Sequence, residues 1–456
     1  MEATALFWKR PYTDHTKRMV LGLLLVILGS LLFVTGHSDA TTAASCQKSV
    51  TRYAGTTNTI YIAGADVVCT PADIQVMYPS SMKHPKARTF MLKSNIVLQQ
   101  GATLIIKGGT ASDATTDEFR MMSNNNNMTN NFVNITADYG TVHITNTKVK
   151  SWDEATKAAD TEYGDIYKRA FIRVRSRAIG NVQNISRMNI VNSDIGYLGY
   201  YGAESYGLAW KVMDSAFDKV DVLGNITNSR IHNNYFGVYT FGAFGMVINQ
   251  NEFDHNIKYG LDPHDDSDSL KITNNSSHHN GDHGIICSQR CDNLLISGNN
   301  SYSNAGHGIM LHRSVDNSII ENNTVAYNGD TGIALFESNH NIIRGNLVKS
   351  NKNGIRLSVG SSYNLFENNI IEKTKEIAIY TYKGSDTPVR SDGINAGNAW
   401  KTNTVTGTGL LVLQLTATHG DQFKSNSFAG NPLAGYDTNR VTNTSFVSNS
   451  TDLNNL

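Results

Sequence analysis

Short apolar strands recur along this chain at a nearly constant spacing of 24 residues. Each follows a glycine and reads apolar-x-apolar, as in Ile285-Ile286-Cys287 and Ile309-Met310-Leu311. The glycines are 22 to 24 residues apart, at Gly237, Gly260, Gly284, Gly308, Gly332 and Gly354, and Ala378 holds the next place. No segment shows the long period of an amphipathic helix. The pattern therefore predicts short strands separated by bends and stacked in coils of about 24 residues.

Two asparagine columns follow the same period, nine and four residues before each glycine. The first contains Asn228, Asn251, Asn275, Asn299 and Asn323; the second contains Asn233, Asn256, Asn280, Asn304 and Asn328. Asparagine tolerates left-handed backbone and bonds to its own turn, so we expect ladders of these side chains at the coil corners. A β-propeller needs a period of about 40 residues, and a leucine-rich repeat needs a leucine ladder with a helix. The predicted fold is therefore all-β, a right-handed parallel β-helix.

The N-terminus has the pattern of a targeting segment. Lys9, Arg10, Lys17 and Arg18 precede an apolar run that begins at Met19. The apolar run is longer than the apolar region of a typical secretory signal peptide and shorter than a full membrane-spanning helix. A cleaved signal peptide and an uncleaved membrane anchor therefore both stay open. The basic residues place the N-terminus in the cytosol and the rest of the chain on the other side of the membrane. We expect a protein of the secretory pathway that is extracellular, in the cell wall, or anchored in the Golgi or plasma membrane.

These changes of pattern divide the chain into five parts. They are a cytosolic basic leader over 1–18, a signal peptide or signal-anchor helix over 19–36, an irregular N-terminal segment and helix cap over 37–94, the parallel β-helix over 95–430, and a C-terminal tail over 431–456. Four cysteines fit a secretory route, and Cys46 and Cys69 are placed to pair. The formal net charge is zero, so no global basic field indicates nucleic acid.

One coil departs from the repeat. Where the others are apolar, the chain reads Tyr259-Gly260-Leu261-Asp262-Pro263-His264-Asp265. Positions one and three after the glycine point inward, so Asp262 and His264 point outward. Pro263 removes a ladder donor and is rarely tolerated in a central strand. Polar groups that break a scaffold pattern in this way indicate where the chemistry lies.

Neighbouring coils add polar residues to the same face, because equal positions in successive coils are lateral neighbours about 4.8 Å apart. The columns are His264, Ser288 and His312; Tyr259, His283 and His307; Asp265, Gln289, Arg313 and Glu337; and Asp262 with Arg356. Arg290 lies at the end of its strand. Taken singly, His307, His278 and His279 are interpreted as solvated polar residues on the outside of the solenoid.

The odd coil closely resembles the Tyr-Gly-x-Asp-Pro-His-Asp signature of the mannuronan C5-epimerase family. His283-Gly284-Ile285-Ile286, Leu311-His312-Arg313-Ser314, Glu337-Ser338 and Gly354-Ile355-Arg356-Leu357-Ser358 are also similar to that family. The resemblance runs over about residues 225–370 and is closest to the brown-algal and periplasmic bacterial type. The bacterial enzymes have an arginine where this chain has Gln289, with Arg290 next, so the arginine that meets the substrate carboxylate stays open.

The resemblance implies an isomerase that inverts C5 of β-D-mannuronate to α-L-guluronate within alginate. The proton at C5 is α to a carboxylate, so the reaction needs a neutralised carboxylate, a base on one face and an acid on the other. His264 and Tyr259 are the candidate pair, in an order that stays open. Asp262 orients or neutralises, and His283 tunes Tyr259. The substrate-binding candidates are Arg290, Arg313, Arg356, Asp265 and His312.

Two other functions compete with this one. A polysaccharide lyase of the alginate or pectate type shares the first proton removal and then expels the C4 oxygen, and a non-catalytic β-helix would only bind polysaccharide. Glycoside hydrolysis is less favoured, because no matched carboxylate pair is evident. We expect alginate or polymannuronate as the partner, a monomer, no metal ligands and no required cofactor. Calcium binding at the acidic run Asp265–Asp268 stays open but is not indicated, because the spacing does not match an EF-hand loop.

Overall fold

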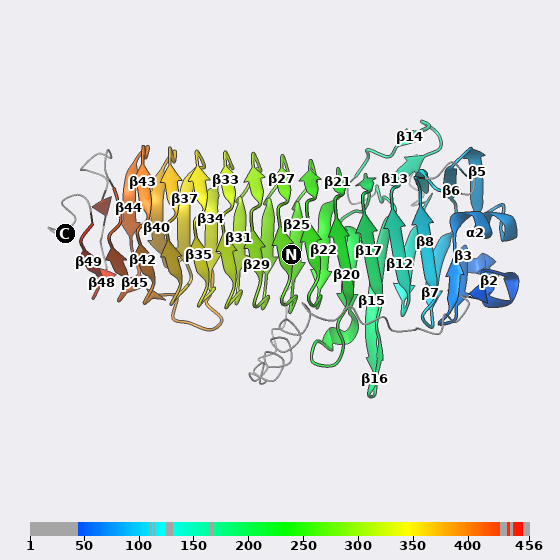
Figure 1. Ribbon diagram of the computed structural model, residues 1–456, viewed down its shortest axis with the longest axis horizontal. Helices are drawn as coiled ribbons and strands as arrows, with labels where there is room; N and C mark the ends of the chain where they lie inside the picture. Colours follow the sequence, from blue (N-terminus) through cyan, green and yellow to red (C-terminus); the bar gives the residue numbers. More distant parts are fainter. Residues whose placement is uncertain are drawn as a thin grey trace, which may run out of the picture. The chain divides into compact units, whose positions relative to one another are not determined.

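The computed structural model describes residues 44–109, 112, 115–124, 131–163, 167–428, 436–437 and 441–449. The predicted leader and the apolar segment 19–36 lie outside these residues. Within the described ranges, no helix has the length and apolar character needed to cross a membrane. The unit Ala43–Leu456 is a right-handed parallel β-helix built from three long sheets (Figure 1), which confirms the predicted fold.

Each coil in the middle of the stack contributes one strand to each sheet. Sheet A contains, in order along the stack, β1 (Ala44–Ser45), β4 (Val67–Cys69), β8 (Thr103–Lys107), β12 (Thr141–Thr145), β17 (Arg187–Val191), β20 (Leu223–Thr227), β23 (Val247–Asn249), β26 (Lys271–Thr273), β29 (Leu295–Ser297), β32 (Ile319–Glu321), β35 (Ile342–Arg344), β38 (Leu365–Glu367), β42 (Ala399–Lys401), β46 (Gln422–Lys424) and β49 (Ser445–Val447). Its strands pair in parallel throughout the described part of the stack, for example β26 with β29.

Sheet B carries the glycine column. It contains β2 (Thr51–Ala54), β3 (Thr59–Ala63), β7 (Asn95–Gln99), β11 (Asn134–Asp138), β15 (Phe171–Ile179), β19 (Gly207–Val212), β22 (Phe236–Phe241), β25 (Leu261–His264), β28 (Ile285–Ser288), β31 (Ile309–His312), β34 (Thr331–Phe336), β37 (Asn353–Ser358), β40 (Ile377–Tyr382), β44 (Leu411–Leu415) and β47 (Tyr436–Asp437), with β16 (Val182–Asn184) in a hairpin on β15. A Cβ at Gly284 would lie 2.2 Å from Ser301 Oγ and 2.9 Å from Gly308 O, so the stacked coils leave room only for glycine.

Sheet C precedes sheet B in each coil. It contains β5 (Met82–Lys86), β6 (Thr89–Leu92), β9 (Glu118–Asn124), β13 (Lys148–Asp153), β18 (Asp194–Gly196), β21 (Arg230–His232), β24 (Glu252–Asp254), β27 (Ser276–His278), β30 (Asn300–Tyr302), β33 (Thr324–Ala326), β36 (Leu347–Lys349), β39 (Ile370–Glu372) and β43 (Thr404–Thr406), with β10 (Asn131–Phe132) on β9 and β14 (Ala158–Ala159) on β13. The remaining elements are β41 (Asn395–Ala396), β45 (Thr418–His419), β48 (Val441–Thr442), the helix α2 (Pro71–Met77) and the 3₁₀ turns η1 (Lys48–Val50), η2 (Gly55–Thr57) and η3 (Met213–Ser215).

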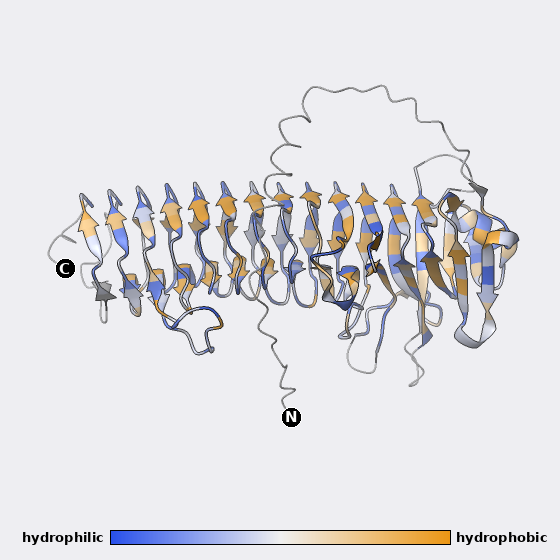
Figure 2. Cartoon of the chain, turned by 90° about the horizontal axis from the view of Figure 1, so that it is seen from below, coloured by the Kyte–Doolittle hydropathy of each residue, from blue (hydrophilic) through white to orange (hydrophobic). Residues whose placement is uncertain are grey.

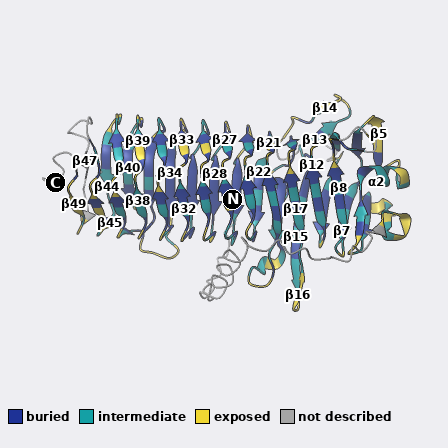
Figure 3. Ribbon diagram, viewed as in Figure 1, coloured by how far each residue is buried: buried dark blue, intermediate teal, exposed yellow. Residues whose placement is uncertain are grey.

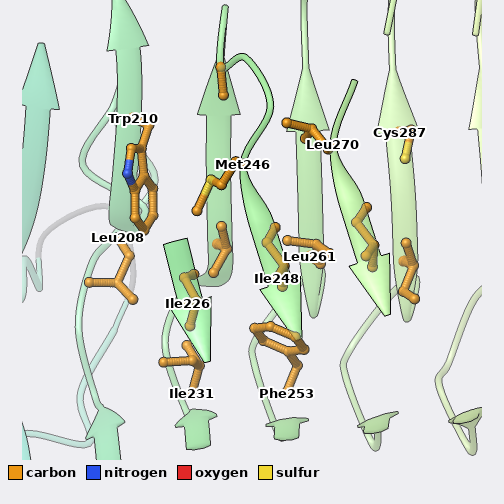
Figure 4. Close-up of a cluster of buried hydrophobic side chains, with 14 of the residues drawn as sticks. Leu208, Trp210, Ile226, Ile231, Met246, Ile248, Phe253, Leu261, Leu270 and Cys287 are labelled. Carbon is orange, nitrogen blue, oxygen red and sulfur yellow. The ribbon is translucent and has the colours of Figure 1, made fainter. Parts of the chain in front are cut away.

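The interior is filled by apolar side chains that repeat once per coil. In sheet A the register places Ile226 beside Ile248 and Ile248 beside Ile272. Figure 4 shows Ile226, Ile248, Phe253 and Leu261 packed together inside the coils, and all four are fully buried. Hydrophobic and hydrophilic residues alternate along the strands (Figure 2), and exposed residues lie mainly at corners and projecting loops (Figure 3). Each buried Ile or Phe contributes about 1.5–3 kcal/mol relative to exposure, so the stacked core stabilises the scaffold beneath sheet B.

The asparagine ladders are present, with a difference in backbone conformation. Asn275 Oδ1 accepts the backbone N–H of Asn251 at 3.0 Å, and Asn251 Nδ2 donates to Ile226 O at 2.8 Å. The left-handed corner residue is the one before the ladder asparagine, for example Gln250 with φ 58°. The ladder side chains thus satisfy buried backbone groups of the preceding coil.

Asn228 and Asn233 do not belong to the ladders, contrary to the prediction. Both are left-handed corner residues, with φ of 51° and 53°. Ser229 and Asn234 take the ladder places, and their backbone N–H groups donate to Asn251 Oδ1 and Asn256 Oδ1 at 3.0 Å. The cause is a difference between the sheets: the strands of sheets A and C are 22 residues apart here, as at Ile226 and Ile248, whereas those of sheet B are 23 apart, as at Val238 and Leu261. The ladder places therefore lie one residue closer to Gly237 than the prediction put them.

The stacked strands extend beyond both predicted limits of the solenoid. The segment predicted as irregular contains β3, which pairs in parallel with β7 and buries Ile60 and Ile62. Its cap includes α2, where Thr70 and Asp73 form a capping box, and the predicted Cys46–Cys69 disulfide is confirmed. At the other end, β46 pairs with β49, so coils continue past residue 430, where a tail was predicted. These end coils lack the glycine column on which the prediction depended.

Candidate active site

The odd coil places Asp262 and His264 on the outer face of sheet B. Leu261 is fully buried in the core, and the register places His264 beside Ser288 and Ser288 beside His312, as predicted. Strands β25 and β28 pair at Leu261–Ile285 and at His264–Ser288, with Pro263 between these two positions. A proline lacks the N–H that a ladder needs, so the strand carries its polar residues over an interrupted ladder.

Asp262 is buried although it faces outward. The residue is 2% exposed, and its Oδ1 has no hydrogen-bond partner among the described atoms. Burial raises the pKa of this carboxyl to about 7, against the smaller lowering effects of His264 and of a hydrogen bond with Ser288. Near neutral pH the carboxyl is therefore protonated in part of the folded molecules and ionised in the rest. The protonated form can donate a hydrogen bond to an anionic oxygen.

His264 is oriented by the carboxylate that follows it. Its Nδ1 contacts Asp265 Oδ2, which leaves Nε2 as the ring nitrogen available for proton transfer. Burial lowers the pKa of His264, but the bond to Asp265 and the charge of Asp262 outweigh it and raise the pKa above its usual value. Asp265 also contacts Arg290 Nη2, and Arg290 Nε donates to Asp266 Oδ2 at 3.0 Å. A carboxylate–imidazole pair of this kind fixes both the tautomer and the direction of the ring.

Tyr259, His283 and His307 form the predicted column beside this strand. The Tyr259 and His283 rings stack at 5.3 Å, and the His283 and His307 rings at 4.7 Å. Burial and Asp282 raise the pKa of Tyr259 to about 12. Burial lowers the pKa of His283, whose Nδ1 accepts the backbone N–H of His307 at 3.0 Å. Tyr259 therefore keeps its proton and His283 stays neutral at neutral pH.

Two of the histidines interpreted as solvated are buried. His307 is 5% exposed and belongs to the Tyr259 column, and His278 is 8% exposed and lies on sheet C. His278 Nε2 pairs with Glu252 at 3.0 Å, and its ring stacks on Tyr302 at 4.6 Å. The column positions are covered by their neighbours in the stack, which an estimate from polarity alone misses.

The three predicted arginines have different partners. Arg290 is held by Asp265 and Asp266. Arg313 lies 3.2 Å from Asp386 and 3.9 Å from Glu337. Arg356 Nη2 lies 3.2 Å from a ring nitrogen, His307 Nε2, and Arg356 Nε is buried without a hydrogen-bond partner among the described residues.

Asp386 belongs to an insertion that the sequence reading missed. Successive coils are 23 residues apart at Ile342 and Leu365, but 34 apart at Leu365 and Ala399. The extra residues follow β40, and this segment reaches back across the corner of sheet B. Arg390 pairs with Asp316 at 2.6 Å. The lengthened spacing was the available signal.

Other contributors were also missed. Tyr239 lies opposite Asp262 in the preceding coil, and its ring is 5.6 Å from that of His264. Burial and Asp262 raise the pKa of Tyr239. Phe236 packs against Tyr259 at 4.9 Å. Tyr239 stands two positions after Gly237, as Asp262 stands two positions after Gly260. The alignment of equal positions in successive coils could therefore have identified it.

An apolar patch lies beside the polar residues on the outer face of sheet B. It is a second hydrophobic cluster, separate from the main core, with Tyr259 packed against it, and consists of Ile286, Met310, Ala334, Phe336 and Val359. His312 lies over Phe336 at 4.8 Å, and burial lowers its pKa to about 4. Apolar surroundings strengthen electrostatic contacts, so donors fixed beside this patch stabilise a developing charge more than they would in water. Within the described parts of the chain, no group of three or more His, Cys, Asp or Glu side chains is arranged to hold a metal ion.

A family model described as a right-handed beta helix region matches residues 181–289 and 267–446. The chain belongs to this right-handed beta-helix family. It is also similar to a protein named mannuronan C5-epimerase from Pseudomonas aeruginosa, with 29% identity over 199 residues, 43% of this chain and 33% of that protein. A protein of that name from Azotobacter vinelandii is 29% identical over 137 residues, 29% of this chain and 25% of that protein. The match thus spans a third or less of the length of these relatives.

Solved structures show the same fold. The crystal structure of the periplasmic alginate epimerase AlgG superposes with a TM-score of 0.66 and 21% sequence identity, over 86% of this chain and 85% of that one. At that identity the likeness establishes the β-helix alone.

Proposed function

We propose that this protein is a mannuronan C5-epimerase, an isomerase that inverts β-D-mannuronate to α-L-guluronate within the alginate polymer. One observation carries the proposal: the buried Asp262, whose Oδ1 has no partner in the described part of the chain, lies two residues from His264, whose Nδ1 is held by Asp265. This strand also carries the signature by which the chain resembles the epimerases. The similarity to proteins of that name favours the epimerase over a polysaccharide lyase.

Asp262 prepares the substrate for proton loss. Its protonated carboxyl donates a hydrogen bond to the C6 carboxylate, and a neighbouring cation adds charge stabilisation. When the C5–H bond breaks, its electron pair moves toward C6, and this developing charge needs donors already in place. The buried position of Asp262 keeps its proton available near neutral pH.

His264 and Tyr259 move the proton. One accepts the C5 proton, and the other supplies a proton to the opposite face of the same carbon, so C5 is inverted with no net change in composition. Asp265 holds the His264 ring, and the His283 ring stacks on Tyr259. Arg290, Arg313, Arg356 and His312 then bind the flanking sugars, in line with a polymer that carries one carboxylate per residue.

The proposal places this activity outside the cytosol. The Cys46–Cys69 disulfide is typical of oxidising compartments, and the basic leader with its apolar run directs the chain across a membrane. We propose that the protein acts as a monomer, in line with Tyr259, Asp262 and His264 all coming from one chain.

The test is incubation of the purified protein with polymannuronate, read by proton NMR and ultraviolet absorbance. Guluronate signals without unsaturated ends support the epimerase. Absorbing unsaturated ends indicate the lyase, and binding without any product indicates a polysaccharide-binding β-helix. A His264→Asn variant, which keeps size and polarity but removes the proton carrier, serves as the control.

A further inference from the structure

His307 makes an unusual pair of contacts for a buried histidine. It is 5% exposed, and its ring stacks on His283 at 4.7 Å. The backbone N of Thr331 lies 3.1 Å from its Nδ1. Its Nε2 lies 3.2 Å from Arg356 Nη2. Each ring nitrogen therefore faces a donor that belongs to a different strand.

The two donors compete for one acceptor. A backbone N–H and a guanidinium only donate, whereas a neutral imidazole accepts at one nitrogen and carries its proton on the other. A protonated imidazole would face both donors with N–H groups of its own. His307 is therefore held neutral: burial and the charge of Arg356 lower its pKa well below the usual value.

Arg356 keeps donor capacity beyond this contact. Its Nε is buried without a hydrogen-bond partner in the described structure, and its Nη1 lies 3.9 Å from Asp330 Oδ2, too far for a hydrogen bond. Arg290, by contrast, is held by two carboxylates. A guanidinium has five donors in a fixed fork that matches a carboxylate, so Arg356 is the better prepared to accept one from a ligand.

The contact also sets where Arg356 acts. Its own strand is four coils beyond Asp262, but its guanidinium reaches back to His307, which is two coils beyond Tyr259 in the stacked column. Two coils correspond to about 10 Å. That distance matches about two sugar residues of an extended polymer.

We infer that His307 is a positioning residue that holds the Arg356 guanidinium over the outer face, so that Arg356 binds the carboxylate of a uronate about two sugars from the reacting one. The identity of the ligand rests on the proposed function. In this role Nε2 accepts from Arg356, so the ring carries its proton on Nδ1, and the buried His307 acts only through Arg356.

Two substitutions separate this role from a structural one. In His307→Asn the amide oxygen takes the place of Nδ1, which keeps the Thr331 contact and loses Arg356. In His307→Gln the oxygen takes the place of Nε2, which keeps Arg356 and loses Thr331. Binding of a labelled mannuronate oligosaccharide is measured by fluorescence anisotropy at equilibrium, in a His264→Asn background that stops turnover.

We expect His307→Asn to weaken binding by about tenfold or more, as Arg356→Ala does, because a charge-assisted contact is lost. His307→Gln retains most of the affinity. The double variant His307→Asn with Arg356→Ala binds no more weakly than Arg356→Ala alone. His278→Asn, at an equally buried histidine on sheet C, leaves affinity unchanged.

Other outcomes overturn the inference. Equal affinity in the Asn and Gln variants, or additive losses in the double variant, would show that His307 does not act through Arg356. If the oligosaccharide does not bind the parent protein, the assigned ligand is wrong. The proposed function fails separately: a protein that shows this binding pattern but forms no guluronate keeps the positioning role and loses the epimerase.

Discussion

Replacing Asp262 with Asn should stabilise the protein at alkaline pH while it stops the reaction. In the folded protein, burial raises the pKa of Asp262 from 3.8 to about 7. The unfolded chain loses this proton near pH 4, and the folded chain keeps it until about pH 7. Because the folded state binds more protons in this window, stability falls as pH rises from about 4 to about 7.

The magnitude follows from the size of the shift. A difference of about three pH units corresponds to about 4 kcal/mol of stability that the wild-type protein lacks at pH 8. Asn cannot ionise, so Asp262→Asn removes this cost. The buried amide adds donors that need partners, at about 1–3 kcal/mol. The variant should therefore be more stable than the wild-type protein at pH 8 by about 1–3 kcal/mol, and of equal or lower stability at pH 4.

Thermal unfolding midpoints at pH 4 and pH 8, recorded at one scan rate, measure the effect. The difference between Asp262→Asn and wild type should grow by a few degrees with pH. Asp214→Asn, which changes an exposed carboxylate in an ion pair with Arg177, is the control and should show no such change. If the wild-type and Asp262→Asn midpoints shift equally with pH, the carboxyl does not hold a proton in the folded state and the reasoning is wrong.

The remaining predictions concern the reaction itself. His264→Asn and Tyr259→Phe should each slow guluronate formation by about 10²–10⁴-fold with unchanged unfolding midpoints, whereas His278→Asn should match wild type. If both catalytic variants retain near-wild-type rates, the site lies elsewhere. Arg290→Ala should weaken polymannuronate binding and its dependence on salt, because one charge-assisted contact is lost; an unchanged titration at low and high salt would exclude that contact. With His264 as the base, kcat/KM should rise with pH as His264 loses its proton and fall above about pH 7 as Asp262 does; a flat profile from pH 5 to 9 would contradict these roles.

The coil register could be predicted because each residue in it obeys a local rule. Strand alternation placed Leu261 inward and His264 outward, and the glycine spacing placed His312 two coils further. The same rules mis-assigned Asn228, because a single missing residue in one coil shifts its corner. Periodicity therefore gives the architecture, and it loses accuracy wherever the period changes.

Burial and long-range pairing could not be predicted in this way. Asp262 faces outward yet is buried in the stack, where Tyr239 of the preceding coil is its lateral neighbour. Asp386 meets Arg313 across 73 residues through an insertion whose path no repeat dictates. The state of a carboxyl and the choice among three arginines depend on such contacts, so the sequence indicated the residues of the site without their protonation or partners.

The central claim is that the outer face of sheet B exchanges the C5 proton of mannuronate with inversion. Proton NMR of polymannuronate incubated with the purified protein in deuterated water tests it most directly. The account predicts guluronate residues that carry deuterium at C5, formed by wild type and suppressed in His264→Asn. A polymer that binds but remains pure mannuronate without deuterium, or one that is cut to unsaturated ends, would contradict it.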